Sequence, residues 1–115
     1  MLKKEVIGMQ HINMDRNQEI TWISGLLEGE GCFDLAKNKY SRVRLYMTDK
    51  DIVKRYVNIC NKNNINTPSI KTQIRNNRKD IYGLTIYGNN AQILMNLVLP
   101  FMGKRRSQKI KELIT

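Results

Sequence analysis

The sequence predicts an α+β fold, in which a single domain carries a four-stranded antiparallel sheet with helices on one face. Apolar residues recur at helical spacing in four segments, and they alternate with polar residues in two further segments. Each alternating segment contains a polar turn near its middle, which is typical of a β-hairpin. The chain has 115 residues, 41% of them hydrophobic, which is enough for one core.

The first helix follows an N-terminal arm, residues 1–17, in which apolar periodicity is weak. Asn17 can cap a helix that begins near Gln18 and runs to about Gly29. The apolar residues of this helix recur three and four positions apart: Ile20, Ile23, Leu26 and Leu27. We therefore place the folded domain at residues 18–115.

The first hairpin follows this helix. Residues 32–36 and 42–47 alternate with a period of two, and "NKYS" at 38–41 forms the turn between them. One face of the second run carries the apolar residues Val43, Leu45 and Met47. The other face carries Arg42, Arg44 and Tyr46.

A second helix and a second hairpin repeat this order. Thr48 or Asp49 caps the helix. Its apolar stripe consists of Ile52, Val53, Tyr56, Val57 and Cys60. After Pro68, the alternating residues are Ile70, Thr72 and Ile74 on one face and Lys71, Gln73 and Arg75 on the other. "NNRKD" forms the turn, and the returning strand directs inward Tyr82, Leu84 and Ile86.

Two helices complete the order helix, hairpin, helix, hairpin, helix, helix. Residues 89–99 have the spacing of a third helix, which Pro100 ends. Residues 103–114 form a last, basic helix. Because antiparallel sheets bury one face, we expect the helices to cover the apolar face and to leave the polar face open.

The charge of the chain favours nucleic acid as its partner. The formal net charge is +10 and the pI is near 9.9, so the chain attracts polyanions. A polar sheet face is usually only solvated, but this one is rich in side chains that donate to phosphates and base edges. The same features argue against a small dimeric interaction module without a nucleic-acid role. We expect contacts to double-stranded DNA from Asp34, Asn38, Arg42, Arg44, Tyr46, Lys71, Gln73, Arg75, Arg78 and Lys79.

Several classes of protein are disfavoured. Cys32 and Cys60 form no Cys-x-x-Cys pair, which argues against a structural zinc site and a disulfide framework. No segment approaches the length of a membrane span, and the N-terminus has no continuous apolar run of the kind found in signal peptides. We therefore expect an intracellular protein, in the cytoplasm or an organellar matrix, with no membrane contact and no small-molecule cofactor.

The stretch "WISGLLEGEGCF" is apolar and acidic in an otherwise basic chain. Gly25 and Gly29 share a helix face, with Ser24 beside them, and small residues allow a second helix to approach closely. Because the chain has no second copy of this stretch, the partner helix would come from an identical subunit. We expect a homodimer with Ser24, Gly25, Glu28 and Gly29 at its interface.

Glu28 and Glu30 fall at the C-terminal end of the same helix. The helix dipole disfavours a carboxylate there, and a symmetric dimer would bring two sets of carboxylates together. A divalent cation would relieve both effects, because hard cations take carboxylate and backbone carbonyl oxygens.

Three segments resemble the LAGLIDADG homing endonuclease family. "ISGLLEGEG", residues 23–31, resembles the motif that names the family, with glutamate at both acid positions. "MTDKD", residues 47–51, lies where the family begins its second core helix, and "LPFMGKRRSQK", residues 99–109, resembles its C-terminal segment. The resemblance covers residues 18–114 and implies the family's αββαββα core, which agrees with the order of elements inferred above.

The resemblance also implies a function. The second acid of the motif binds the catalytic metal with the carbonyl of the preceding residue, which here are Glu30 and Gly29. A chain with one motif acts as a homodimer that binds a long, pseudo-palindromic site. It cuts both strands with a stagger, using Mg²⁺ (or Mn²⁺).

Two positions of the family pattern leave a second function open. The basic residue near the active site aligns best with Arg105, with Lys104 as the alternative, and a position that often carries Gln falls at Asp49. Arginine stabilises charge but does not transfer protons. These departures favour the alternative that the chain is a catalytically inactive DNA-binding regulator or an RNA-splicing maturase.

Overall fold

The computed structural model describes residues 13–114 and shows four helices, one 3₁₀ turn and four strands. Their order is α1 (Arg16–Glu30), β1 (Cys32–Ala36), β2 (Tyr40–Met47), α2 (Lys50–Lys62), β3 (Lys71–Gln73), β4 (Ile81–Tyr87), α3 (Gly88–Val98), η2 (Leu99–Phe101) and α4 (Lys104–Leu113). The predicted α+β class and the αββαββα order are therefore confirmed.

The four strands form one antiparallel sheet in the order β1-β2-β4-β3. Val43 in β2 pairs with Phe33 in β1 and with Ile86 in β4, so one row of buried apolar side chains crosses the sheet. Leu45 and Leu84 form the next row. The period-two pattern thus assigns the inward face of β2 and β4 correctly.

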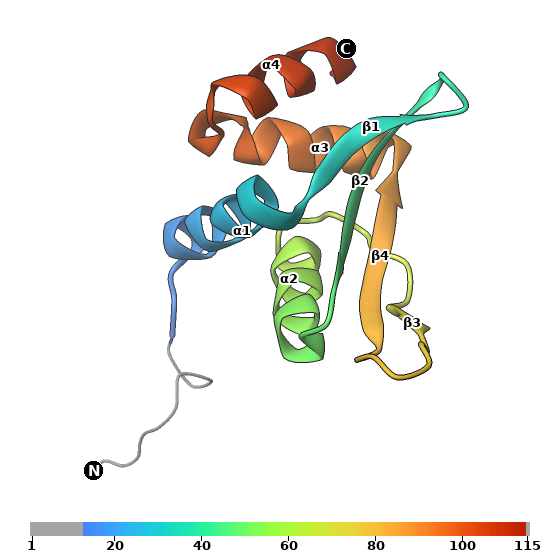
Figure 1. The fold of residues 1–115 in the computed structure, drawn as a ribbon. Helices are drawn as coiled ribbons and strands as arrows, with labels where there is room; N and C mark the ends of the chain where they lie inside the picture. Colours follow the sequence, from blue (N-terminus) through green and yellow to red (C-terminus); the bar gives the residue numbers. More distant parts are fainter. Residues whose placement is uncertain (1–12, 115) are drawn as a thin grey trace.

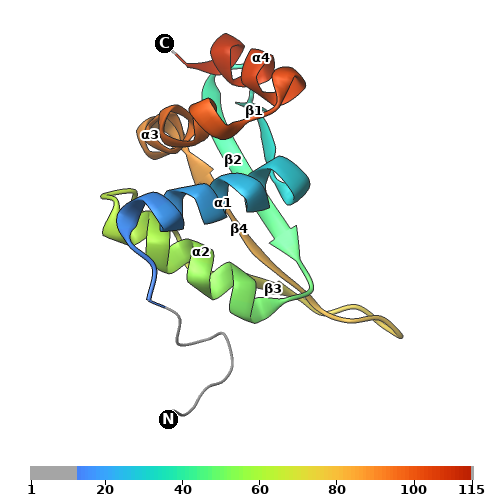
Figure 2. The same cartoon turned by 90° about the vertical axis from the view of Figure 1, so that its left-hand side faces the viewer.

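All helices lie on the same side of the sheet (Figures 1 and 2). The core lies between the two layers and includes Leu27, Tyr56, Leu94 and Ile110, one from each helix, all fully buried. The opposite face of the sheet has no covering element within the described residues (Figure 1). No described helix is both long and apolar enough to cross a membrane.

Helix α1 begins earlier than the sequence indicated. Asp15 is the N-cap: its carboxylate accepts the amide of Gln18 at 2.8 Å, and the Gln18 side chain accepts the Asp15 amide at 2.9 Å. This reciprocal capping box satisfies two donors, whereas Asn17 lies inside the helix. The predicted cap at Asn17 was therefore wrong. Residues 1–12 of the predicted arm lie outside the described residues.

The first hairpin turns one residue before the predicted segment begins. Lys37 and Asn38 both have positive φ, 54° and 55°, as the tight turn between β1 and β2 requires. Ser41, which the sequence placed in the turn, lies in β2 instead. Its buried hydroxyl donates to the Leu113 carbonyl at 3.1 Å and so helps to hold α4 on the sheet.

The second hairpin is shorter than predicted. Strand β3 contains only three residues, and Ile74 is 81% exposed rather than packed on the apolar face. Arg75 lies in the loop beyond the strand, where its guanidinium donates to the Lys79 carbonyl at 2.8 and 3.0 Å. Its predicted place on the polar face of a strand was therefore wrong.

Candidate functional site

The motif helix α1 exposes two glycines on one face. A Cβ atom added at Gly25 or Gly29 would meet no atom within 4 Å from other parts of residues 13–114. Ser24 is different, because it is 1% exposed and its hydroxyl donates to the Ile20 carbonyl at 2.7 Å. The subunit's own core therefore buries Ser24, which the sequence had placed at the dimer interface, so the exposed strip of this helix consists of Gly25 and Gly29.

Glu28 contacts its own chain. Its Oε1 accepts the amide of Gly103, the N-cap of α4, at 2.6 Å. Its Oε2 lies 3.3 Å from Nε of Arg106, an ion pair without hydrogen-bond alignment. Glu28 thus compensates the positive N-terminus of α4 within the subunit. The sequence predicted Glu28 only at the dimer interface and did not indicate this contact.

Arg106 connects the end of α1 to α4. Its Nη1 donates to the Gly31 carbonyl at 2.6 Å, and its guanidinium lies 5.9 Å from the centre of the Phe33 ring. Sequence reasoning missed this residue, because nothing in "KRR" distinguishes the arginine that turns inward from its neighbours. Glu28, Gly31 and Arg106 hold the backbone on both sides of Glu30.

Glu30 itself is exposed at the last position of α1. Among residues 13–114 its carboxylate has no hydrogen-bond or ion-pair partner. The last carbonyls of a helix also carry partial negative charge, so Glu30 and the Gly29 carbonyl form a small group of hard oxygen donors. Within the described residues, no group of three or more His, Cys, Asp or Glu side chains is arranged so that it could hold a metal ion.

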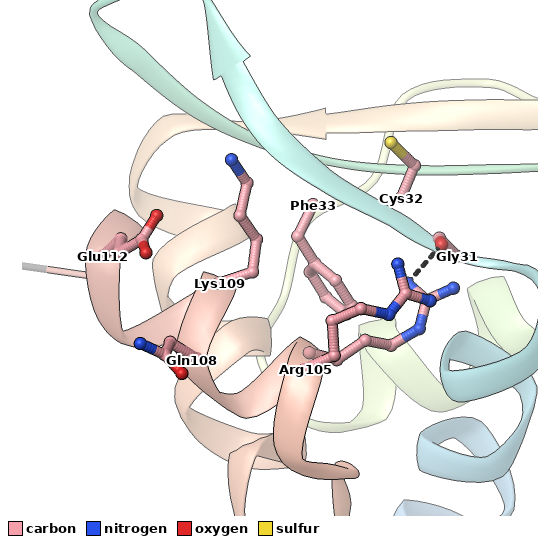
Figure 3. A pocket seen from close by; sticks show the side chains of 8 residues that line it. Gly31, Cys32, Phe33, Arg105, Gln108, Lys109 and Glu112 are labelled. Carbon is pink, nitrogen blue, oxygen red and sulfur yellow. Dashed lines mark hydrogen bonds between the residues drawn. The ribbon is translucent and has the colours of Figure 1, made fainter.

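A groove of about 500 Å³ lies between α4 and β1, beside the end of the motif. Arg105 and Lys109 extend from α4 toward this strand (Figure 3). Lys104 lines a different groove, with Ser107 and Lys111. Of the two basic candidates, the structure therefore brings Arg105 rather than Lys104 to the groove that Gly31 lines.

Asp49 occupies the N-cap position of α2, but its side chain makes no capping hydrogen bond. Only its carbonyl takes part, accepting the Val53 amide at 3.3 Å. Asp49 lines neither of the α4 grooves, so the structure gives no contact between it and the basic candidates.

The open face of the sheet carries a charged cluster on β1 and β2. Asp34 accepts hydrogen bonds from Arg42 Nε at 2.5 Å and from Arg44 Nη2 at 2.6 Å. Burial alone would raise the pKa of Asp34, but the hydrogen bonds and charges of the two arginines outweigh it and hold the pKa below its usual 3.8. The carboxylate is therefore ionised at neutral pH.

The other predicted DNA-binding residues are spread along this face and its loops. The Tyr46 hydroxyl lies 3.1 Å from the hydroxyl of Thr85, a residue that the sequence reasoning missed although the alternation of β4 places it outward. The exposed members of the predicted set are Asn38 at the hairpin tip, Tyr46 in β2, Lys71 and Gln73 in β3, and Arg78 and Lys79 in the β3–β4 loop.

Comparison with known proteins identifies the family. Residues 17–96 match the LAGLIDADG-like domain. The chain is 26% identical over 114 residues to a Debaryomyces hansenii protein named "Probable intron-encoded endonuclease aI3"; the match covers 90% of this chain but only 15% of the length of that protein.

The fold also matches a solved structure. A crystal structure of the homing endonuclease I-CvuI with an I-CreI target, in which the DNA is not cleaved, superposes with a TM-score of 0.55. The superposition covers 85% of this chain and 69% of that chain, at 15% sequence identity. Because the matched residues 17–96 make up most of the sequence and include the motif helix, this chain belongs to the LAGLIDADG family.

Proposed function

We propose that this protein is a site-specific homing endonuclease. A homodimer binds a long, pseudo-palindromic duplex through its two open sheet faces and makes a metal-dependent, staggered double-strand break. The observation that carries the proposal is the exposed Glu30 at the end of the motif helix, beside the groove that Arg105 lines. Family membership and the names of the two similar proteins support it.

The donors at the end of α1 suit a hard divalent cation. Glu30 and the Gly29 carbonyl supply oxygen ligands, as Mg²⁺ and Mn²⁺ prefer. When bound, such an ion supplies an activated water and stabilises the leaving oxygen of the phosphodiester. The chain's own residues hold and orient: Glu28 and Arg106 fix the backbone around Glu30, and Arg105 offers a permanent positive charge to the phosphate.

The sheet sets the length of DNA that one subunit reads. Strand β2 has eight residues, which corresponds to roughly 26 Å of strand. At about 3.4 Å per base pair, this length matches roughly eight base pairs of a half-site. The two half-sites of a dimer would then flank the pair of Glu30 residues, one for each DNA strand.

Two observations favour the second candidate, a family member that binds DNA or assists RNA splicing without cutting. Arginine at position 105 cannot transfer a proton. The Asp49 side chain makes no capping hydrogen bond, and Asp49 does not line the groove beside Gly31. The retained Glu30 argues against this candidate, since a carboxylate near phosphates weakens simple binding.

Binding and cutting are tested separately. The full chain is used to select bound duplexes from a random or genomic library in Ca²⁺, and the selected duplex is then incubated with Mg²⁺. Wild type is compared with Glu30→Gln, with Asp51→Asn as the matched control because it also removes one exposed carboxylate, on α2. We expect staggered cutting by wild type and Asp51→Asn, and a loss of at least about a hundredfold in Glu30→Gln.

The other outcomes are equally informative. Specific binding without cutting by any variant would support the regulator or maturase. Equal cutting by Glu30→Gln and wild type would remove Glu30 from the metal site. Failure to select any duplex would contradict both candidates that bind DNA.

A further inference from the structure

The open sheet face carries a carboxylate within its basic surface. Asp34 lies in β1, paired with Arg42 in β2, and the neighbouring pair joins Cys32 to Arg44. DNA phosphates repel an acidic side chain, so a carboxylate on a DNA-binding face needs a compensating role. One such role is to accept from the amino group of cytosine, but the contacts of Asp34 indicate another.

Both oxygens of Asp34 are engaged by guanidinium groups. Oδ1 accepts from Arg42 Nε at 2.5 Å, and Oδ2 accepts from Arg44 Nη2 at 2.6 Å and from Arg42 Nη2 at 3.3 Å. Arg44 Nη2 also donates to Cys32 Sγ, 3.1 Å away. The Asp34 side chain is 25% exposed, so the carboxylate and the two arginines form one partly buried cluster.

The Arg44 guanidinium is held in an orientation that leaves its Nε donor without a hydrogen-bond partner in the described structure. Its Nε is shielded from solvent and has no hydrogen-bond partner among the described residues. Unpaired buried donors are rare in native proteins and call for an explanation. The two bonds through Nη2 hold the guanidinium in place, which is expected where the orientation serves a function other than fold stability.

The arginines keep donors for a ligand. Asp34 and Cys32 accept four hydrogen bonds from the pair. Two guanidiniums offer more than twice that number of N–H groups, so donors remain for a ligand even without the shielded Nε of Arg44. Guanine presents O6 and N7 in the major groove, and the fork of an arginine matches both. An arginine that a carboxylate already holds loses less freedom on docking than a mobile one.

We propose that Asp34 is a positioning residue, which holds Arg42 and Arg44 in the orientation in which their remaining N–H groups read base edges, guanine above all. The proposal rests on the DNA-binding function proposed above. Asp34 then increases discrimination between sequences while it weakens the general attraction of the sheet to DNA.

The test measures sequence preference rather than activity. Duplexes bound by the full chain in Ca²⁺ are selected from a random library, for wild type and for Asp34→Asn. Arg42→Ala and Arg44→Ala identify the base pairs that each arginine reads. Asp51→Asn, which makes the same change on the helical side of the sheet, is the control, and circular dichroism establishes that every variant is folded.

We expect Asp34→Asn to lose preference at the base pairs that the two arginine variants identify, with discrimination falling about tenfold. Affinity for unrelated duplex should stay constant or rise, because a negative charge has been removed. The double variant Asp34→Asn/Arg42→Ala should lose no more at the Arg42 base pair than Arg42→Ala alone. A merely structural role would instead weaken binding to all duplexes alike.

Unchanged preferences in Asp34→Asn would overturn the proposal. A loss confined to a base pair that neither arginine variant identifies would also overturn it, because Asp34 would then contact a base directly. If wild type selects no sequence at all, the DNA-binding function itself fails. That result is distinct from specific wild-type selection with an unaltered Asp34→Asn profile.

Discussion

Three acidic side chains of this basic protein differ in what surrounds them. Asp34 and Glu28 each contact cationic groups of their own chain, an arginine pair and the N-terminus of α4 with Arg106. Glu30 is exposed and has no such partner among the described residues. An anion already balanced by the protein has little to offer a cation, so Glu30 is the acid of the motif that remains available to a metal.

Asp34 makes stability depend on pH. Its pKa is lowered in the folded state, so the ionised form stabilises folding above the unfolded value of 3.8, and this contribution is lost as pH falls through the lower folded pKa. We expect Asp34→Asn to lower the free energy of unfolding by about 0.2–1 kcal/mol at neutral pH, because the cluster is partly exposed. Urea denaturation over a pH series should show this difference shrinking below pH 3.8.

The control for this measurement is Asp51→Asn, which removes one exposed carboxylate from α2. A deficit in Asp34→Asn that stays constant, or grows, as the solution becomes more acidic would show that the arginines do not stabilise the ionised carboxylate.

At the scale of elements, the junction of α1 and α4 is the arrangement on which the site depends. The Gly103 amide and the Gly31 carbonyl are both bonded across this junction, to Glu28 and Arg106 respectively. The two helices therefore hold each other's ends, and the groove that Arg105 lines opens beside them. Disturbing the junction should loosen α4 before it affects the sheet.

Glu28→Ala should lower the free energy of unfolding by about 1–2 kcal/mol, because it leaves the Gly103 amide without an acceptor and Arg106 without its counter-ion. Glu28→Gln retains an acceptor and should lose about half as much. Denaturant midpoints at constant slope measure the loss, and hydrogen exchange at Gly103 locates it. Glu112→Ala, at an exposed position in α4, is the control; a loss as large as that of Glu28→Ala would show no special role for the junction.

At the scale of the whole molecule, two surfaces remain without partners in the described structure. The bare sheet face and the Gly25–Gly29 strip of α1 belong to different layers (Figure 2). A dimer formed through the strip would leave both sheet faces available to one duplex. The net charge of +10 on each subunit would then attract the phosphates of both half-sites.

Gly25→Leu separates folding from assembly. No other part of the described chain lies within 4 Å of a Cβ at this position. Leucine favours helix over glycine by roughly 0.5–1 kcal/mol, so the monomer should be as stable as wild type or more stable. The leucine side chain would block a close helix crossing. Sedimentation equilibrium should then show a dimer dissociation constant at least about tenfold higher than that of wild type. Asn58→Leu, on the exposed side of α2, is the control. If the assembly of Gly25→Leu matches wild type, the strip is not the dimer interface.

The periodicity of apolar residues was enough to predict most of the helices and strands. An element that buries one face carries its apolar residues at the spacing of that helix or strand. The inward residues Val43, Leu45, Leu84 and Ile86 of the two central strands were assigned correctly from this pattern, whereas the buried Ile59 of α2 was missed. The errors lie where a single local contact decides. Asp15 and Gln18 cap each other and move the start of α1, and two positive φ angles shift the hairpin turn.

For the site, the sequence by itself determined the motif, the basic charge and the alternation that directs Arg42 and Arg44 outward. Only the tertiary structure decided how the charges pair. Glu28 and Gly103 are 75 positions apart, as are Gly31 and Arg106, and Asp34 meets its arginines only because the hairpin closes in one register. Such contacts depend on how separate elements pack together, and the spacing of residues within one element does not indicate that packing.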